Sequence, residues 1–168
     1  LDTLGFIVEN LDLPQSITRE KVAEAMQRKI GFYNKGDDRY NLLSALQKSV
    51  RGSDPDAAVH YLARLIDGGA DIQMIGRRLL VMASEDIGMA YPSAVSIVNA
   101  CVQAALMVGY PEAAVNLSQA VVLLASAPKS NASFLAYQEA LEDIRTKEID
   151  DVPDHLKDAH YRGADDLG

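Results

Sequence analysis

The side chains best suited to chemistry in this sequence are three histidines and one cysteine. His60, His155 and His160 form neither an H-E-x-x-H nor a C-x-x-C pattern, the spacings that bring zinc ligands together. Cys101 lies in an apolar helical run with no base near it, which favours a buried structural thiol over a nucleophile. A single cysteine also allows no disulfide within the chain, which fits a reducing compartment. The sequence therefore predicts no catalytic residue and no metal site.

Two neighbouring carboxylates, Glu85 and Asp86, form the next candidate for acid–base chemistry. Adjacent residues of a helix point about 100° apart, so this pair does not make a dyad on one face. We expect a structural role instead. Such carboxylates bind helix N-termini or form ion pairs across the fold, and the candidate partners are Arg77, Arg78 and Lys129.

Five basic residues are candidates for contacts with a phosphate or with an acidic group of a neighbouring subunit. They are Lys48, Arg51, Arg77, Arg78 and Lys129. The alternative is an internal network of ion pairs and helix caps, which is favoured because the chain carries a net charge of −8. That charge argues against a stand-alone nucleic-acid binder, since phosphate contacts need a basic face. A local basic face stays open: residues 19–51 hold eight Lys/Arg against four Asp/Glu, and residues 139–168 hold four against ten.

Helices must position these side chains, because apolar residues recur at helical spacing along the chain and no convincing alternating strand appears. The predicted helices cover residues 18–29, 38–50, 55–67, 72–89, 92–108, 111–127 and 131–147. Leu42, Leu46 and Val50 illustrate the apolar stripe that such helices turn toward a core. The predicted fold class is all-α, a bundle of antiparallel helices.

The clearest helix boundary precedes Pro55, which fits the first position of a helix. Gly52 stands where a helix C′ residue needs a left-handed backbone, a conformation that glycine adopts without a Cβ clash. Ser53 or Asp54 can then cap the following helix by accepting its free N–H groups. In the same way, Asp71 is expected to cap the helix after that one.

One stretch is unusual in its lack of charge: between Asp86 and Lys129 the only charged residue is Glu112. The two helices predicted there are apolar around most of their circumference, and such helices are usually buried on several sides. A membrane span does not fit, because a Gly-Tyr-Pro turn interrupts the run before either half reaches about 20 apolar residues. The hairpin is either the centre of a monomeric core or, as we favour, partly packed against another subunit. The candidate oligomer surface comprises Val95, Val98, Val102, Val115 and Val122.

Four ordered blocks, residues 38–58, 77–88, 124–131 and 152–156, resemble the C-terminal region of the bacterial replication-associated recombination protein A (RarA/MgsA) family. The first block includes the string from Lys48 to Ala58, and the last is Val-Pro-Asp-His-Leu, similar to the family's late Val-Pro-x-His-Leu element. The family is itself similar to the Werner-helicase-interacting ATPase and to the collar domains of clamp loaders. The resemblance spans about residues 38–157.

The resemblance implies a division of the chain into four parts. Residues 1–30 resemble the end of an AAA+ lid, 31–37 form a linker, 38–147 form a helical oligomerisation domain, and 148–168 are an acidic, extended tail. The chain starts without Met and within a helical pattern, and its end carries no stop signal, so we expect a piece of a larger protein.

The implied function is to assemble AAA+ ATPase modules as a homotetramer acting at stalled replication forks. No G-x-x-x-x-G-K-[ST] motif occurs here, so we expect ATP and Mg²⁺ to bind upstream of residue 1 and the chain itself to be non-catalytic and free of cofactors. DNA and single-strand-binding or replication proteins are the implied partners of the full-length protein, in the cytoplasm at the nucleoid and without a membrane. The alternative is a monomeric docking module for DNA or replication proteins.

Overall fold

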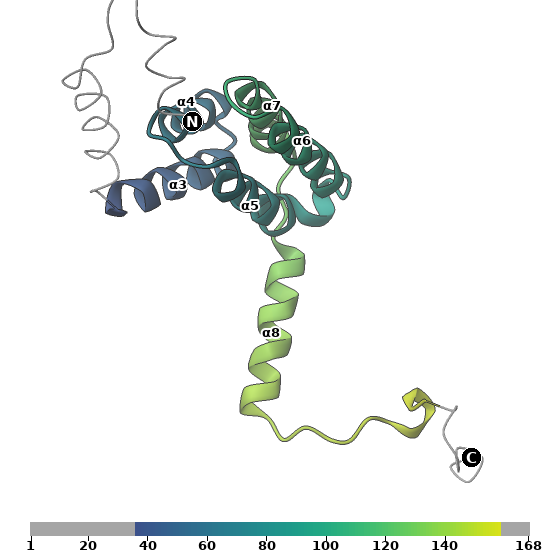
Figure 1. The fold of residues 1–168 in the computed structure, drawn as a ribbon. Helices are drawn as coiled ribbons and strands as arrows, with labels where there is room; N and C mark the ends of the chain where they lie inside the picture. Colours follow the sequence, from purple (N-terminus) through teal and green to yellow (C-terminus); the bar gives the residue numbers. More distant parts are fainter. Residues whose placement is uncertain (1–35, 159–168) are drawn as a thin grey trace, which may run out of the picture. The chain divides into compact units, whose positions relative to one another are not determined.

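The computed structural model describes residues 36–158, and this range is helical and contains no strand (Figure 1). The chain divides into two compact units, Leu1–Ser133 and Phe134–Gly168. The described elements are α3 (Gly36–Arg51), α4 (Pro55–Asp67), α5 (Ile72–Met82), the π-helical turn η1 (Ala83–Ile87), the 3-10 turn η2 (Gly88–Ala90), α6 (Ala94–Val108), α7 (Ala113–Ser126), α8 (Ala132–Thr146) and the 3-10 turn η3 (Asp154–Leu156). The all-α prediction is confirmed. The helix predicted over residues 18–29 and the lid segment 1–30 lie outside the described residues.

The core of the first unit is built from five helices, α3 to α7. α3 packs along α4, α6 packs along α7, and α7 also contacts α3, α4 and α5. The predicted stripes point inward: Leu46, Leu62 and Leu117 are fully buried, and burying a leucine side chain stabilises the fold by about 1.5–3 kcal/mol. All the buried apolar residues of the described range lie between Leu42 and Ala125, so this core closes without α8.

The loop between α3 and α4 corrects one prediction. The left-handed residue is Ser53, with a φ of 56°, and not Gly52. The N–H of Ser53 donates to the carbonyl of Val50, and the N–H of Asp54 donates to that of Ser49, both at 3.0 Å. These two bonds are the Schellman pattern with the serine at C′. The glycine stands one residue too early because α3 extends one residue beyond its predicted end.

The starts of α4 and α5 agree with their predicted signals. Asp54 caps α4 by accepting the N–H of Ala57 at 2.9 Å, and Pro55 occupies the first turn. Asp71 caps α5 by accepting the N–H of Met74 at 2.7 Å. Each such cap contributes about 1 kcal/mol.

Replacing Ser53 by glycine should raise the free energy of unfolding by about 0.5–1 kcal/mol. A left-handed backbone costs a non-glycine residue about 1–2 kcal/mol, and the greater freedom of glycine in the unfolded chain offsets part of that gain. Ser53→Ala is the matched control, because it removes the hydroxyl that accepts from Lys129 but keeps the Cβ. Urea denaturation of both variants measures the difference. Equal stability of the two would contradict strain at this residue.

The helix predicted over residues 72–89 changes its winding before it ends. The α-helix stops at Met82 and continues as the π-helical turn η1 and the 3-10 turn η2. A π-turn re-aims the side chains that follow it and often marks a functional position. Here Asp86 turns inward and is only 5% exposed. Gly88 follows with φ 46° and ψ −129°, and a Cβ at this residue would lie 2.9 Å from the carbonyl oxygen of Ser130.

Candidate binding and assembly surfaces

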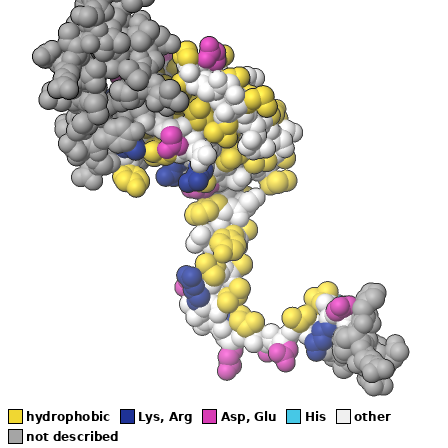
Figure 2. All heavy atoms as spheres, in the orientation of Figure 1, with side chains coloured by type: hydrophobic (Ala, Val, Ile, Leu, Met, Phe, Trp, Pro, Cys, Tyr) yellow, Lys and Arg dark blue, Asp and Glu magenta, His cyan; other side chains and the backbone are white. Residues whose placement is uncertain are grey.

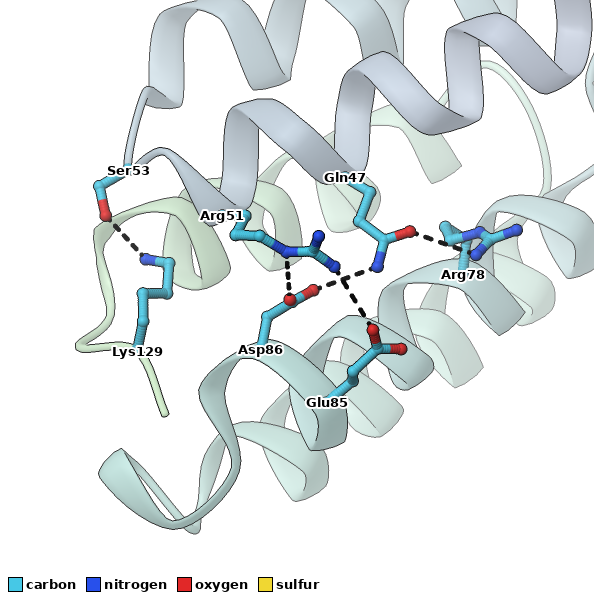
Figure 3. A network of polar contacts seen from close by, with 7 residues as sticks. All are labelled: Gln47, Arg51, Ser53, Arg78, Glu85, Asp86 and Lys129. Atoms are coloured by element: carbon cyan, nitrogen blue, oxygen red, sulfur yellow. Dashed lines mark hydrogen bonds and ion pairs between the residues drawn. The ribbon is translucent and has the colours of Figure 1, made fainter. Parts of the chain in front are cut away.

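A polar network joins the end of α3 to η1, with Asp86 at its centre (Figure 3). Arg51 donates from Nε to Oδ1 of Asp86 at 2.7 Å and lies 3.4 Å from the Glu85 carboxylate. Gln47 donates to the other oxygen of Asp86 at 3.3 Å and accepts from Arg78 at 3.3 Å. The hydrogen bond that Arg51 donates to Asp86, together with the negative charge of that carboxylate, raises the pKa of Arg51. Both oxygens of the buried carboxylate are therefore paired.

A second branch of the network ties the segment after α7 to the same place. Lys129 donates to the hydroxyl of Ser53 at 3.0 Å and to the carbonyls of Ala125 and Ala127, so its charge lies at the C-terminal end of α7, where the helix dipole favours a cation. Burial lowers the pKa of Lys129, and the charge of Asp86 opposes that shift. The backbone N–H of Ser130 donates to the carbonyl of Asp86 at 2.9 Å. The network thus fastens α3, η1 and residues 125–130 together.

The partner predicted for the carboxylate pair was wrong. Asp86 pairs with Arg51, and Arg78 reaches it only through Gln47. The reason is that the last turn of α3 lies against η1 and the π-turn aims Asp86 at it. Lys48, the remaining basic candidate of α3, is exposed away from these bonds.

A groove of about 580 Å³ lies between α3 and α5. Its lining residues are Arg39, Tyr40, Leu43, Asp71, Gln73, Met74, Arg77, Arg78 and Val81. Within the described part of the chain Arg77 makes no hydrogen bond or ion pair, and Arg78 makes one hydrogen bond, to Gln47. Sequence reasoning found these two arginines but missed Arg39 and Tyr40. The sequence could have indicated that Arg39 lines the groove, because it lies one helical turn before Leu43 on the same helix.

The α6–α7 hairpin turns an uncharged face outward. Figure 2 shows a face of hydrophobic and uncharged side chains over these helices. Val95, Val115 and Val122, three residues of the candidate oligomer surface, are exposed, Val115 by 72%. The last turn of α6 and the hairpin turn that follows add further exposed apolar side chains: Leu106, Met107, Val108 and Tyr110.

For two residues of the candidate oligomer surface the prediction was wrong. Val98 and Val102 are buried, because they share the face of α6 that packs into the core. Val102 lies against Gly76 of α5, where an added Cβ would come within 2.6 Å of the valine Cγ1. The close approach of the two helices therefore depends on glycine at residue 76.

Helix α8 is exposed along most of its length. None of its 15 residues is buried, and hydrophobic side chains run along it in Figure 2. Phe134, Tyr137, Leu141 and Ile144 follow one another at spacings of three, four and three, which places them on one face. The structure groups this helix from Phe134 onward with the second unit, and the functional domain predicted over residues 38–147 stays a prediction.

His60, Cys101 and His155, which were considered for metal binding or catalysis, lie on three different elements. The described residues contain no cluster of His, Cys, Asp or Glu that could hold a metal ion. Cys101 is buried, and this burial raises the pKa of its thiol. His60 lies on α4 and His155 in η3, while His160 falls outside the described residues. No helix in the described range is both long and apolar enough to cross a membrane.

Comparison with known proteins assigns this domain to a class of AAA+ ATPases, in which it forms the C-terminal region. Residues 52–168 match the family described as MgsA AAA+ ATPase C terminal. The chain belongs to this family, as the blocks in its sequence predicted.

Individual relatives match nearly the whole chain. Replication-associated recombination protein A of Bacillus subtilis is 53% identical over 161 residues, covering 95% of this chain and 38% of that protein. The protein of the same name from Escherichia coli K12 is 40% identical over 173 residues, covering 100% and 39%. ATPase WRNIP1 of Dictyostelium discoideum is 39% identical over 153 residues, covering 90% and 18%. The chain thus spans about two fifths or less of the length of these curated relatives.

Proposed function

We propose that this domain assembles the AAA+ ATPase modules of its parent protein into a homotetramer and sets their spacing. The proposed setting is replication-associated recombination, the process that appears in the names of two relatives. The observation that carries the proposal is the uncovered apolar face of α8, defined by Phe134, Tyr137, Leu141 and Ile144 and called the α8 stripe below.

The α8 stripe needs a covering surface for a physical reason. An isolated helix shorter than about 12–15 residues is marginal in water, and α8 has 15 residues and none buried. Spacings of three and four residues are those of helices that pack side by side on a partner. Since the core of the first unit is closed by α3 to α7, we assign the covering surface to a second copy of the chain.

The exposed face of the α6–α7 hairpin supplies a second apolar surface. Val95, Val115 and Val122 lie on it without a charged neighbour on either helix. A closed tetramer with dihedral symmetry uses two different kinds of contact between subunits. Two separate uncovered surfaces on one chain therefore fit a tetramer better than a dimer.

In this proposal the domain itself performs no catalysis. ATP and Mg²⁺ belong to an upstream ATPase domain of the parent protein, because the chain carries no phosphate-binding loop motif. DNA and single-strand-binding or replication proteins are partners of the whole protein, acting in the cytoplasm at the nucleoid. The movement of the ATPase modules reaches the tetramer through the segment before α3.

Light scattering across a wide concentration range tests this assembly. The native chain should have the mass of a tetramer, and Leu141→Glu should reduce it to a dimer or less at micromolar concentration, because a buried unpaired carboxylate costs several kcal/mol and breaks the contact made by the α8 stripe. Ala136→Glu is the matched control, since it adds the same charge to α8 outside the stripe and should keep the tetramer. A native chain that is monomeric at every concentration would reject the proposal and favour a docking module.

A further inference from the structure

We propose that the groove between α3 and α5 binds the acidic segment 148–156 of a second copy of this chain. The inference rests on the proposed function, because it assumes that copies meet. It assigns a binding role to Arg77 and Arg78, and it gives the tail after α8 a partner.

The groove combines cations with an apolar floor. Arg77 and Arg78 come from α5, and the Arg77 guanidinium has no partner in the described part of the chain. Leu43, Met74 and Val81 line the same hollow. Guanidinium groups bind carboxylates through two parallel hydrogen bonds, so the matching ligand carries carboxylates next to apolar side chains.

An acidic side chain in the groove does not cancel this charge. Asp71 also lines it, but its carboxylate accepts the N–H of Met74 at 2.7 Å as the cap of α5. Arg77 and Arg78 face this single acid. The groove therefore keeps a positive balance on a chain whose net charge is −8.

The segment 148–156 has the complementary chemistry. It contains four carboxylates, and its apolar residues Ile149, Val152 and Leu156 are all more than half exposed. Residues 148–153 contain no helix or strand, so they can lie extended along a groove. Six extended residues reach about 20 Å, more than the roughly 12 Å that α5 covers between Gln73 and Val81.

Two observations favour this occupant. The segment directly follows α8, so an α8 stripe packed on a neighbouring copy carries the segment onto that copy at high effective concentration. A nucleic-acid strand fits less well, because its affinity comes from many phosphate contacts and the groove offers an apolar floor with few cations.

A labelled peptide of residues 147–158 provides the direct test. The receptor is the full chain with its own segment disabled by Ile149→Ser, Asp150→Asn, Asp151→Asn and Val152→Ser. Fluorescence anisotropy should show this receptor binding the peptide at least tenfold more tightly than the native chain, whose own segments compete. Adding Arg77→Glu should weaken binding at least tenfold. Lys48→Glu, the same charge change on exposed α3 surface outside the groove, should leave it within twofold.

Three results of these binding measurements would overturn the inference. One is no peptide binding to the disabled receptor, and another is binding that Arg77→Glu and Lys48→Glu weaken equally. The third is binding of a labelled oligothymidylate, lost in Arg77→Glu, with no binding of the peptide. Light scattering of the native chain runs in parallel, so a tetramer with no peptide binding rejects the inference alone and leaves the proposed function standing.

Cross-linking decides which copy supplies the segment. A chain with Gln73→Cys, which keeps both groove arginines, is mixed with a chain with Val152→Cys under mild oxidation, and Cys101 is buried and stays unreactive. A disulfide between the two chains supports the inference. If a single chain carrying both substitutions forms the bond only within itself while the mixture forms none, the segment binds its own groove and the inference is overturned.

Discussion

Replacing Gly88 by alanine should lower the free energy of unfolding by about 2–4 kcal/mol. The φ of 46° and ψ of −129° are open to glycine and strained for other residues by about 1–3 kcal/mol. The new Cβ would also lie 2.9 Å from the carbonyl oxygen of Ser130, a backbone atom that cannot rotate away. That residue is held by its N–H bond to Asp86, so the clash should loosen the network as well. Urea denaturation at fixed protein concentration measures the loss.

Gly109→Ala is the matched control for this prediction. Gly109 also has a positive φ, 74°, but a Cβ there would meet no atom within 4 Å. Its substitution isolates backbone strain, about 1–3 kcal/mol, and should cost less than Gly88→Ala because it adds no contact. Equal losses in both variants would show that the contact with Ser130 does not matter.

The fold was largely predictable because its signals are local. Pro55, Asp71 and the apolar stripe of α3 each act within one or two helical turns, so the sequence alone places α4, the start of α5 and the buried face of α3. Ser53 shows where such reasoning stops. Whether glycine or serine takes the left-handed position depends on where α3 ends, and the packing of its last turn decides that.

The candidate surfaces were harder to predict, because they depend on which elements meet in space. The basic residues were recognised, but Asp86 was given the wrong partners since nothing in the sequence signals the π-turn that aims it at Arg51. Val98 and Val102 were misplaced for a different reason. A helix that is apolar around most of its circumference carries no periodic signal to separate its inner face from its outer face.

Replacing Asp86 by alanine should lower the free energy of unfolding by about 2 kcal/mol. Hydrogen bonds to charged groups contribute about 1.5–3 kcal/mol, and the half-exposed Arg51 places this pair toward the lower end of that range. The substitution also leaves the amide of Gln47 without its acceptor. Glu85→Ala is the matched control: it removes the neighbouring carboxylate, whose contact with Arg51 is 3.4 Å and more exposed, and should cost less than about 0.5 kcal/mol.

A double-mutant cycle with Arg51→Ala separates the ion pair from the rest of the network. If the bond between Nε of Arg51 and Oδ1 of Asp86 carries most of the effect, the coupling energy should be about 1–2 kcal/mol, while the cycle with Glu85 should give almost none. Asp86→Asn should keep part of the stability, because its amide oxygen can still accept from Arg51 while its NH₂ group faces the donor of Gln47. Equal costs for Asp86→Ala and Glu85→Ala would contradict the central place of Asp86. Asp86→Ala should cost more than Glu85→Ala because, of the two carboxylates, only that of Asp86 is buried by the turn η1. A buried carboxylate must keep both of its hydrogen-bond donors.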